Sequence, residues 1–61
     1  MVTVRGKHHD ENTGKYYLYC SGDRAAQLGL YEVDGATYHE ASVGLMYNPA
    51  KVARWKFIGT Q

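Results

Sequence analysis

The segment KYYLYCS, residues 15–21, decides the fold class of this chain because apolar and aromatic side chains fill both of its faces. At the two-residue period of a β-strand it divides into Tyr16, Leu18 and Cys20 on one face and Tyr17 and Tyr19 on the other. One face must belong to a core. We expect the other face to be covered or to serve as a contact surface.

Glycine recurs on both sides of this segment at a spacing that suits short strands joined by tight turns. The spaced glycines are Gly6, Gly14, Gly22, Gly29, Gly35 and Gly44. Five of the segments that they delimit are rich in Val, Leu and Tyr, and β-branched and aromatic residues suit a pleated, half-buried surface. No βαβ spacing is present. The sequence therefore predicts a mainly β fold, a small antiparallel sheet of about five or six strands that is partly closed into an SH3-like or OB-like barrel.

Further segments have strand character, and the expected strands are residues 1–7, 15–21, 28–33, 36–40, 41–47 and about 52–58. Asp34-Gly35 predicts a hairpin, because a type I′ turn needs positive φ at both central positions. The stretch 41–47 is interpreted as a continuation of the preceding strand through a bulge.

Two polar stretches separate the first strands. Residues 8–14 contain no apolar side chain and are expected to form the longest loop, which ends in a left-handed turn at Asn12-Thr13-Gly14. Residues 21–27 break the alternation and support at most a single helical turn, capped by Ser21 or Asp23.

The C-terminal region allows two interpretations. Asn48, Pro49 and Gly59 are typical of a helix start and stop, which favours an α+β fold with a helix at 49–58. At the strand period, however, Trp55 and Phe57 share one face, and we expect both rings to face the core. We therefore expect a turn or one helical turn at 48–51, followed by a strand; the helix remains the alternative.

The size of the chain limits its organisation. Its 61 residues predict one domain, 1–61, whose core buries only about 60% of the unfolded surface, so a homodimer is expected. Cys20 is the only cysteine, which excludes an internal disulfide and favours a cytoplasmic protein. The sequence contains no apolar run long enough for a membrane span, and we expect no secretory signal.

Few residue patterns indicate chemistry. His8, His9, Asp10 and Glu11 can each bind a metal, but adjacent histidines on a strand point to opposite faces, so we expect no metal and no cofactor. Cys20 shares its strand face with Leu18 and is interpreted as a small buried side chain, not as a nucleophile. We therefore expect no enzymatic activity.

The six tyrosines are the one excess that indicates a function. Tyrosine is enriched at protein interfaces, so the expected protein-binding residues are Tyr17, Tyr19, Tyr31, Tyr38 and Tyr47. The sequence thus favours a non-catalytic protein-binding module, an inhibitor or regulator of the size of phage-type accessory proteins. The alternative is a single-stranded nucleic-acid-binding domain whose basic residues are Arg5, Lys15, Arg54 and Lys56. A net charge of +1 gives no general attraction to nucleic acid.

Overall fold

The computed structural model describes residues 1–22 and 28–59. An antiparallel sheet dominates these residues, with its five strands in the order β4-β1-β2-β3-β5. The elements are β1 (Val2–Asp10), β2 (Lys15–Gly22), β3 (Gly29–Val33), α1 (Gly35–Glu40), β4 (Met46–Tyr47), α2 (Pro49–Val52) and β5 (Lys56–Gly59). The predicted mainly β fold is confirmed. The expected closure into a barrel is wrong, because β4 and β5 lie at opposite edges and no pairing joins them in the described residues.

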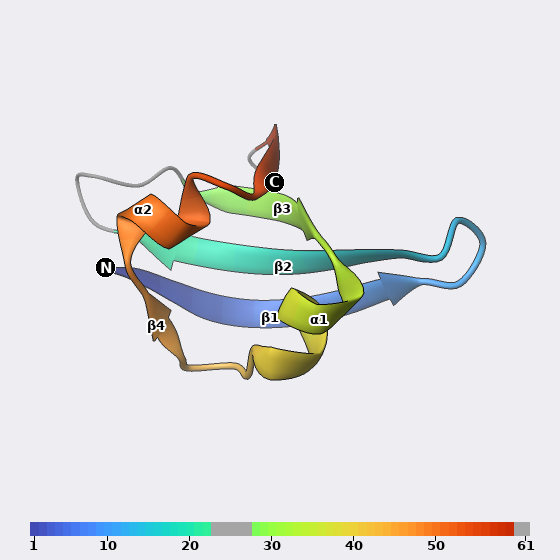
Figure 1. Ribbon diagram of the computed structural model, residues 1–61, viewed down its shortest axis with the longest axis horizontal. Coiled ribbons are helices and arrows are strands. Elements are labelled where there is room, and N and C mark those ends of the chain that lie inside the picture. Colours follow the sequence, from blue (N-terminus) through green and yellow to red (C-terminus); the bar gives the residue numbers. More distant parts are fainter. Residues whose placement is uncertain (23–27, 60–61) are drawn as a thin grey trace.

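Both helices lie on the same face of the sheet. After β3 the chain crosses this face through α1 to reach β4 at the far edge, and it crosses back through α2 to reach β5 beside β3. Figure 1 is drawn from this side, so α1 and α2 are seen in front of the strands. The two crossings leave the opposite face of the sheet without a covering element in the described residues.

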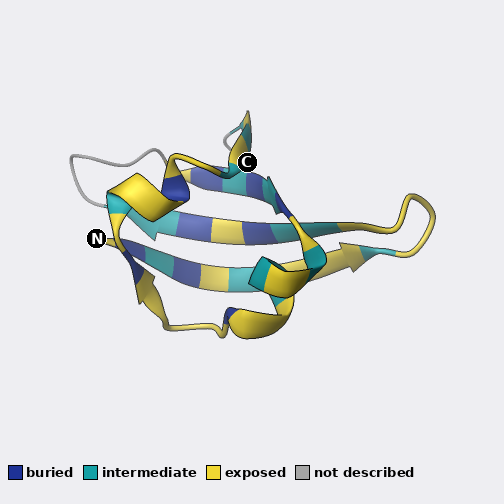
Figure 2. Ribbon diagram, viewed as in Figure 1, coloured by how far each residue is buried: buried dark blue, intermediate teal, exposed yellow. Residues whose placement is uncertain are grey.

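The core lies between the sheet and the two crossings (Figure 2). It consists of Val2, Val4, Leu18, Cys20, Tyr31, Val33, Ala41, Tyr47 and Val52. Trp55 and Phe57 are partly buried against it, and both contact the Tyr31 ring, at centroid distances of 6.0 and 5.2 Å. The prediction that Leu18 and Cys20 face the core is therefore confirmed, as is the inward orientation of the two C-terminal rings.

The β1–β2 hairpin is longer than the sequence indicated. Residues 8–10 continue β1, with Asp10 paired to Lys15, so the predicted loop over 8–14 is wrong except for the turn at 11–14. The left-handed turn is present at Gly14, which has φ 75° and donates its N–H to the Asp10 carbonyl at 2.7 Å. The Asp10 carboxylate accepts the Asn12 N–H, which lowers the pKa of Asp10. The hairpin extends past the rest of the sheet (Figure 1), so its polar side chains are solvated while its backbone stays paired.

The hairpin predicted at Asp34-Gly35 is wrong. Asp34 instead caps α1, its Oδ1 accepting the Thr37 N–H at 2.7 Å, and this contact lowers the pKa of Asp34. Gly35 does not take positive φ. Residues 36–40 are therefore helical and not a strand. The aspartate at the N-cap stabilises the helix because it accepts an N–H of the first turn that would otherwise have no partner.

The last third of the chain combines both interpretations of the sequence. Asn48 caps α2 by accepting the Ala50 N–H at 2.8 Å, which confirms the predicted helical turn, but α2 ends at Val52 and the alternative helix over 49–58 is wrong. The final strand begins at Lys56 and is shorter than expected. The predicted strand 41–47 is likewise reduced to β4, after a turn in which Gly44 has φ 95°.

One expectation lies largely outside the described residues. The helical turn predicted over 21–27 falls on residues 23–27, and the two residues before them, Ser21 and Gly22, are the end of β2. The strands predicted over 1–7, 15–21 and 28–33 are confirmed as β1, β2 and β3.

Candidate functional site

The central strand β2 presents two contrasting faces. Leu18 and Cys20 point to the core and have no exposed surface, whereas Tyr17 and Tyr19 point to the uncovered face, where Tyr19 is 37% exposed. Residues paired across antiparallel strands share a face, so the pairing register gives the neighbours of both tyrosines. We call this surface the open face, and its main side chains are Arg5, His8, Lys15, Tyr17, Tyr19, Ser21, Leu30, Glu32 and Lys56.

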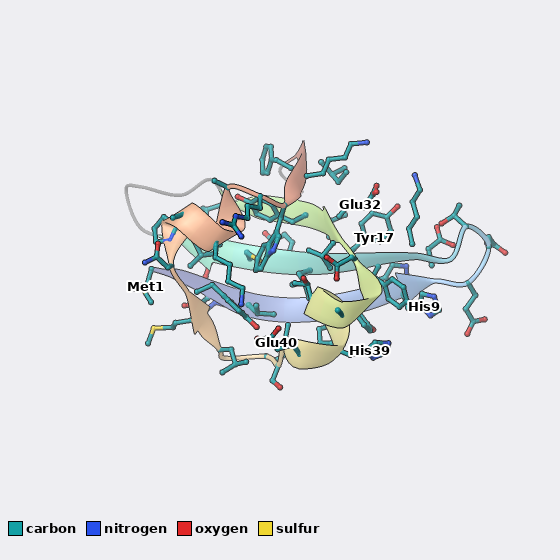
Figure 3. The ribbon with its side chains drawn as sticks, viewed as in Figure 1. Met1, His9, Tyr17, Glu32, His39 and Glu40 are labelled. Carbon is teal, nitrogen blue, oxygen red and sulfur yellow. The ribbon has the colours of Figure 1, made fainter. Side chains whose placement is uncertain are left out.

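Tyr17 lies among polar and charged neighbours. Its ring stacks on His8 of β1 at a centroid distance of 6.2 Å, and Glu32 of β3 lies opposite it (Figure 3). Lys15 Nζ lies 3.6 Å from the Glu32 carboxylate. On the other side of Glu32, Lys56 of β5 is its partner in the strand register, so charges of both signs border the Tyr17 ring.

Tyr19 has a different setting, because its neighbours carry no charge. Gly6 of β1 and Leu30 of β3 flank it. Gly6 has no side chain to cover the ring, and Leu30 is half-buried. Tyr19 and Leu30 therefore form an apolar centre of the open face that remains accessible from the β1 side.

Arg5 reaches the open face through an irregularity in the sheet. The pairing register shifts between Val4 and Gly6, which is the geometry of a β-bulge. Arg5 Nε donates a hydrogen bond of 2.8 Å to Ser21 Oγ on β2. The bulge thus holds one cation beside the uncharged centre of the face.

The structure gathers three of the four cations proposed for nucleic-acid binding. Arg5, Lys15 and Lys56 border the open face, whereas Arg54 is exposed in the connection between α2 and β5, outside the sheet. Arg54 therefore takes no part in this surface.

Of the five tyrosines expected to bind a protein, only Tyr17 and Tyr19 lie on the open face. Tyr31 and Tyr47 belong to the core. Tyr38 is half-buried on α1, on the opposite side of the sheet. The sequence did not indicate that Tyr31 and Tyr47 would be buried, because a tyrosine on a strand suits a core and a surface equally well.

A second ring cluster, which sequence reasoning missed, lies under α1. Tyr16 stacks on His9 at 4.4 Å and contacts Tyr38 at 4.9 Å and His39 at 5.7 Å. Lys7 closes the cluster, with Nζ 4.5 Å from the Tyr38 ring centre and donating to the Ala41 carbonyl at 2.8 Å. The sequence does contain a signal for this cluster, because two ring-bearing residues stand next to each other at 8–9, at 16–17 and at 38–39. This signal becomes informative only once residues 35–40 are known to be helical.

The histidines and carboxylates of residues 8–11 form no metal site in the structure, since no three potential ligands converge anywhere in the described residues. His8 and His9 stack on different tyrosines, Tyr17 and Tyr16, on opposite faces of β1. Cys20 is fully buried, and burial raises the pKa of its thiol to about 11. Its sulfur therefore remains protonated at neutral pH and is a poor nucleophile.

The chain matches no protein-family model, no curated protein and no solved structure. In the described part of the chain, neither helix has the length and apolar character needed to cross a membrane.

Proposed function

We propose that this chain is a non-catalytic protein-binding module, a small inhibitor or regulator of its partner, which it contacts through the open face. The observation that carries the proposal is the composition of that face. An apolar centre of Tyr19 and Leu30 is bordered by Tyr17 and by charges of both signs. An apolar, aromatic centre within a polar rim is typical of protein interfaces.

A binding role is also favoured over catalysis by the placement of the reactive groups. The Cys20 thiol is buried with a raised pKa, which removes it as a nucleophile. A reduced, buried cysteine also fits the cytoplasm, where we propose that the protein acts.

A protein partner is favoured over nucleic acid by the state of the cations. Lys15 is already paired with Glu32, and Arg5 is held by Ser21. The Glu32 carboxylate in the same row would repel a phosphate. Single-stranded nucleic acid remains the second candidate, supported by the presence of Arg5, Lys15 and Lys56 around two rings on which bases could stack.

The first experiment is affinity capture of proteins from an extract of the native host, with the tagged chain as bait. Wild type is compared with the double variant Tyr17→Ala, Tyr19→Ala and with the control Val43→Ala, which alters an exposed side chain away from the open face. We expect wild type and control to capture the same protein and the double variant to lose it while its circular dichroism stays unchanged. Equal capture by a folded double variant would contradict the proposal.

The second experiment separates the two candidate functions. Fluorescence anisotropy with a mixed-sequence single-stranded oligonucleotide at physiological salt should show no binding. If submicromolar binding appears, falls steeply with salt and is lost in Arg5→Ala, Lys56→Ala but kept in Arg54→Ala, nucleic acid replaces protein as the ligand.

A further inference from the structure

The two edges of the sheet differ in how they are protected. Edge strands present unpaired backbone groups, and proteins commonly protect them with lysine. β5 has Lys56 within it and Arg54 just before it. β4 itself carries no charged residue, and the sequence from Ala41 to Ala50 contains none. Lys51 lies close to β4, but its Nζ is held 5.1 Å from the centre of the core-facing Tyr47 ring.

The side chains around β4 are apolar and exposed. Val43, Leu45 and Met46 are all exposed, Met46 by 62%. Met46 pairs with Thr3, and the next residue of β4, Tyr47, is buried in the core. The edge is therefore anchored to the core on its inner side and presents apolar side chains to its surroundings.

The backbone of Met46 points away from the sheet. The Val4 N–H donates to the Leu45 carbonyl at 2.9 Å, and the Gly44 N–H donates to the Val4 carbonyl at 2.8 Å. Val4 and Leu45 are therefore joined by a backbone hydrogen bond across the two strands. Hydrogen-bonded and non-hydrogen-bonded pairs alternate along an antiparallel ladder, so the next pair, Thr3–Met46, is a non-hydrogen-bonded one. The N–H and C=O of Met46 therefore face the outer side of β4, where no described strand lies.

We propose that β4 pairs antiparallel with β4 of a second copy of this chain, about a two-fold axis, so that the two sheets become continuous. Such pairing sets Met46 against its own counterpart and brings no like charges together, because the segment is uncharged. Pairing of β5 with β5 would instead gather Lys56 and Arg54 from both copies. The added apolar contact also supports a small core, which comprises nine buried side chains among the described residues.

The open face takes no part in this contact. β1 separates β4 from β2, so the dimer would leave Tyr17 and Tyr19 uncovered and present two copies of the open face side by side. Failure of the dimer would therefore leave the proposed partner binding intact, and the reverse also holds.

Sedimentation velocity across a range from low micromolar to millimolar concentration tests the proposal. Wild type should self-associate, and Met46→Lys should raise the dimer dissociation constant by roughly a hundredfold, because it opposes two lysines across the axis. The matched control is Ile58→Lys, which changes an exposed side chain of β5 and should associate like wild type. A strictly monomeric wild type, or a dimer that survives Met46→Lys, would overturn the proposal.

Thiol cross-linking gives an independent readout that adds no charge to the contact. A short bismaleimide should join two copies of Met46→Cys but not two copies of Ile58→Cys, and the buried Cys20 should stay unmodified in both. Cross-linking of Ile58→Cys alone would place the contact at β5 and contradict the proposal. A dimer lost in Tyr17→Ala, Tyr19→Ala would contradict it too, by placing the contact on the open face.

Discussion

The two faces of β2 are both apolar or aromatic, yet one is covered and the other is open. Leu18 and Cys20 are sealed under the two crossings of the chain, while Tyr17 and Tyr19 remain uncovered. The difference arises from topology, because the two described crossings, through α1 and α2, lie on the same side of the sheet (Figure 1). It also follows the chemistry of the side chains, since a tyrosine keeps a polar tip in water where leucine has none. A face that is aromatic and left uncovered is a candidate for recognition.

The largest effect should come from the covered face. Leu18 lies at the centre of the sheet with no exposed surface, and Leu18→Ala should cost about 2–5 kcal/mol, enough to unfold much of a small domain. Urea unfolding followed by circular dichroism measures this loss. Tyr19→Ala, one residue along the same strand, should lower the free energy of unfolding far less. Equal losses in the two variants would contradict the assignment of Leu18 to the core and of Tyr19 to the surface.

An intermediate effect is expected where the covered face meets solvent. Trp55 packs edge-on against Tyr47 at 5.2 Å and against Tyr31, but it is only partly buried. Trp55→Ala should therefore cost about 2 kcal/mol, below the roughly 3–5 kcal/mol of a fully buried ring. Thermal unfolding gives the value. If Trp55→Ala keeps full stability but loses the captured partner, the ring belongs to the binding surface and the open face is not the whole site.

The smallest effect concerns a hydroxyl inside the core. Tyr47 is buried, and its hydroxyl has no hydrogen-bond partner in the described residues. Tyr47→Phe removes this polar group while keeping the ring, so stability should be unchanged or rise by up to about 1 kcal/mol. Urea unfolding at several protein concentrations would detect either result. A clear loss of stability would show that the hydroxyl is paired.

Much of the sheet could be predicted from alternation alone. The segment 15–21 specifies a strand because both of its faces are apolar or aromatic. The inward orientation of Leu18 and Cys20 is the better choice of the two, since the tyrosines of the other face have a hydroxyl that can stay in water. Asn48-Pro49 also predicts its helical turn, because the amide oxygen caps the helix and proline needs no N–H partner at its start. These signals succeed because the physical cause lies within a few residues.

Other features depend on contacts that the sequence does not reveal locally. Asp34-Gly35 suits both a type I′ turn and a helix cap. In the structure the Asp34 carboxylate accepts both the backbone N–H and the hydroxyl of Thr37, which favours the cap. Residues 8–10 are polar on both faces, and only their pairing with β2 makes them a strand. The location of Tyr17 and Tyr19 could be predicted, but not that Tyr31 and Tyr47 would be buried, since this depends on where the chain crosses the sheet.

Tyrosine nitration, mapped by mass spectrometry on the free chain and on the complex with its captured protein, tests the role of the open face most directly. In the free chain, Tyr19 should be modified well before Tyr31 and Tyr47. In the complex, the partner should protect Tyr17 and Tyr19 and leave Tyr38, on the other side of the sheet, as reactive as before. Protection of Tyr38 with continued modification of Tyr17 and Tyr19 would contradict the account.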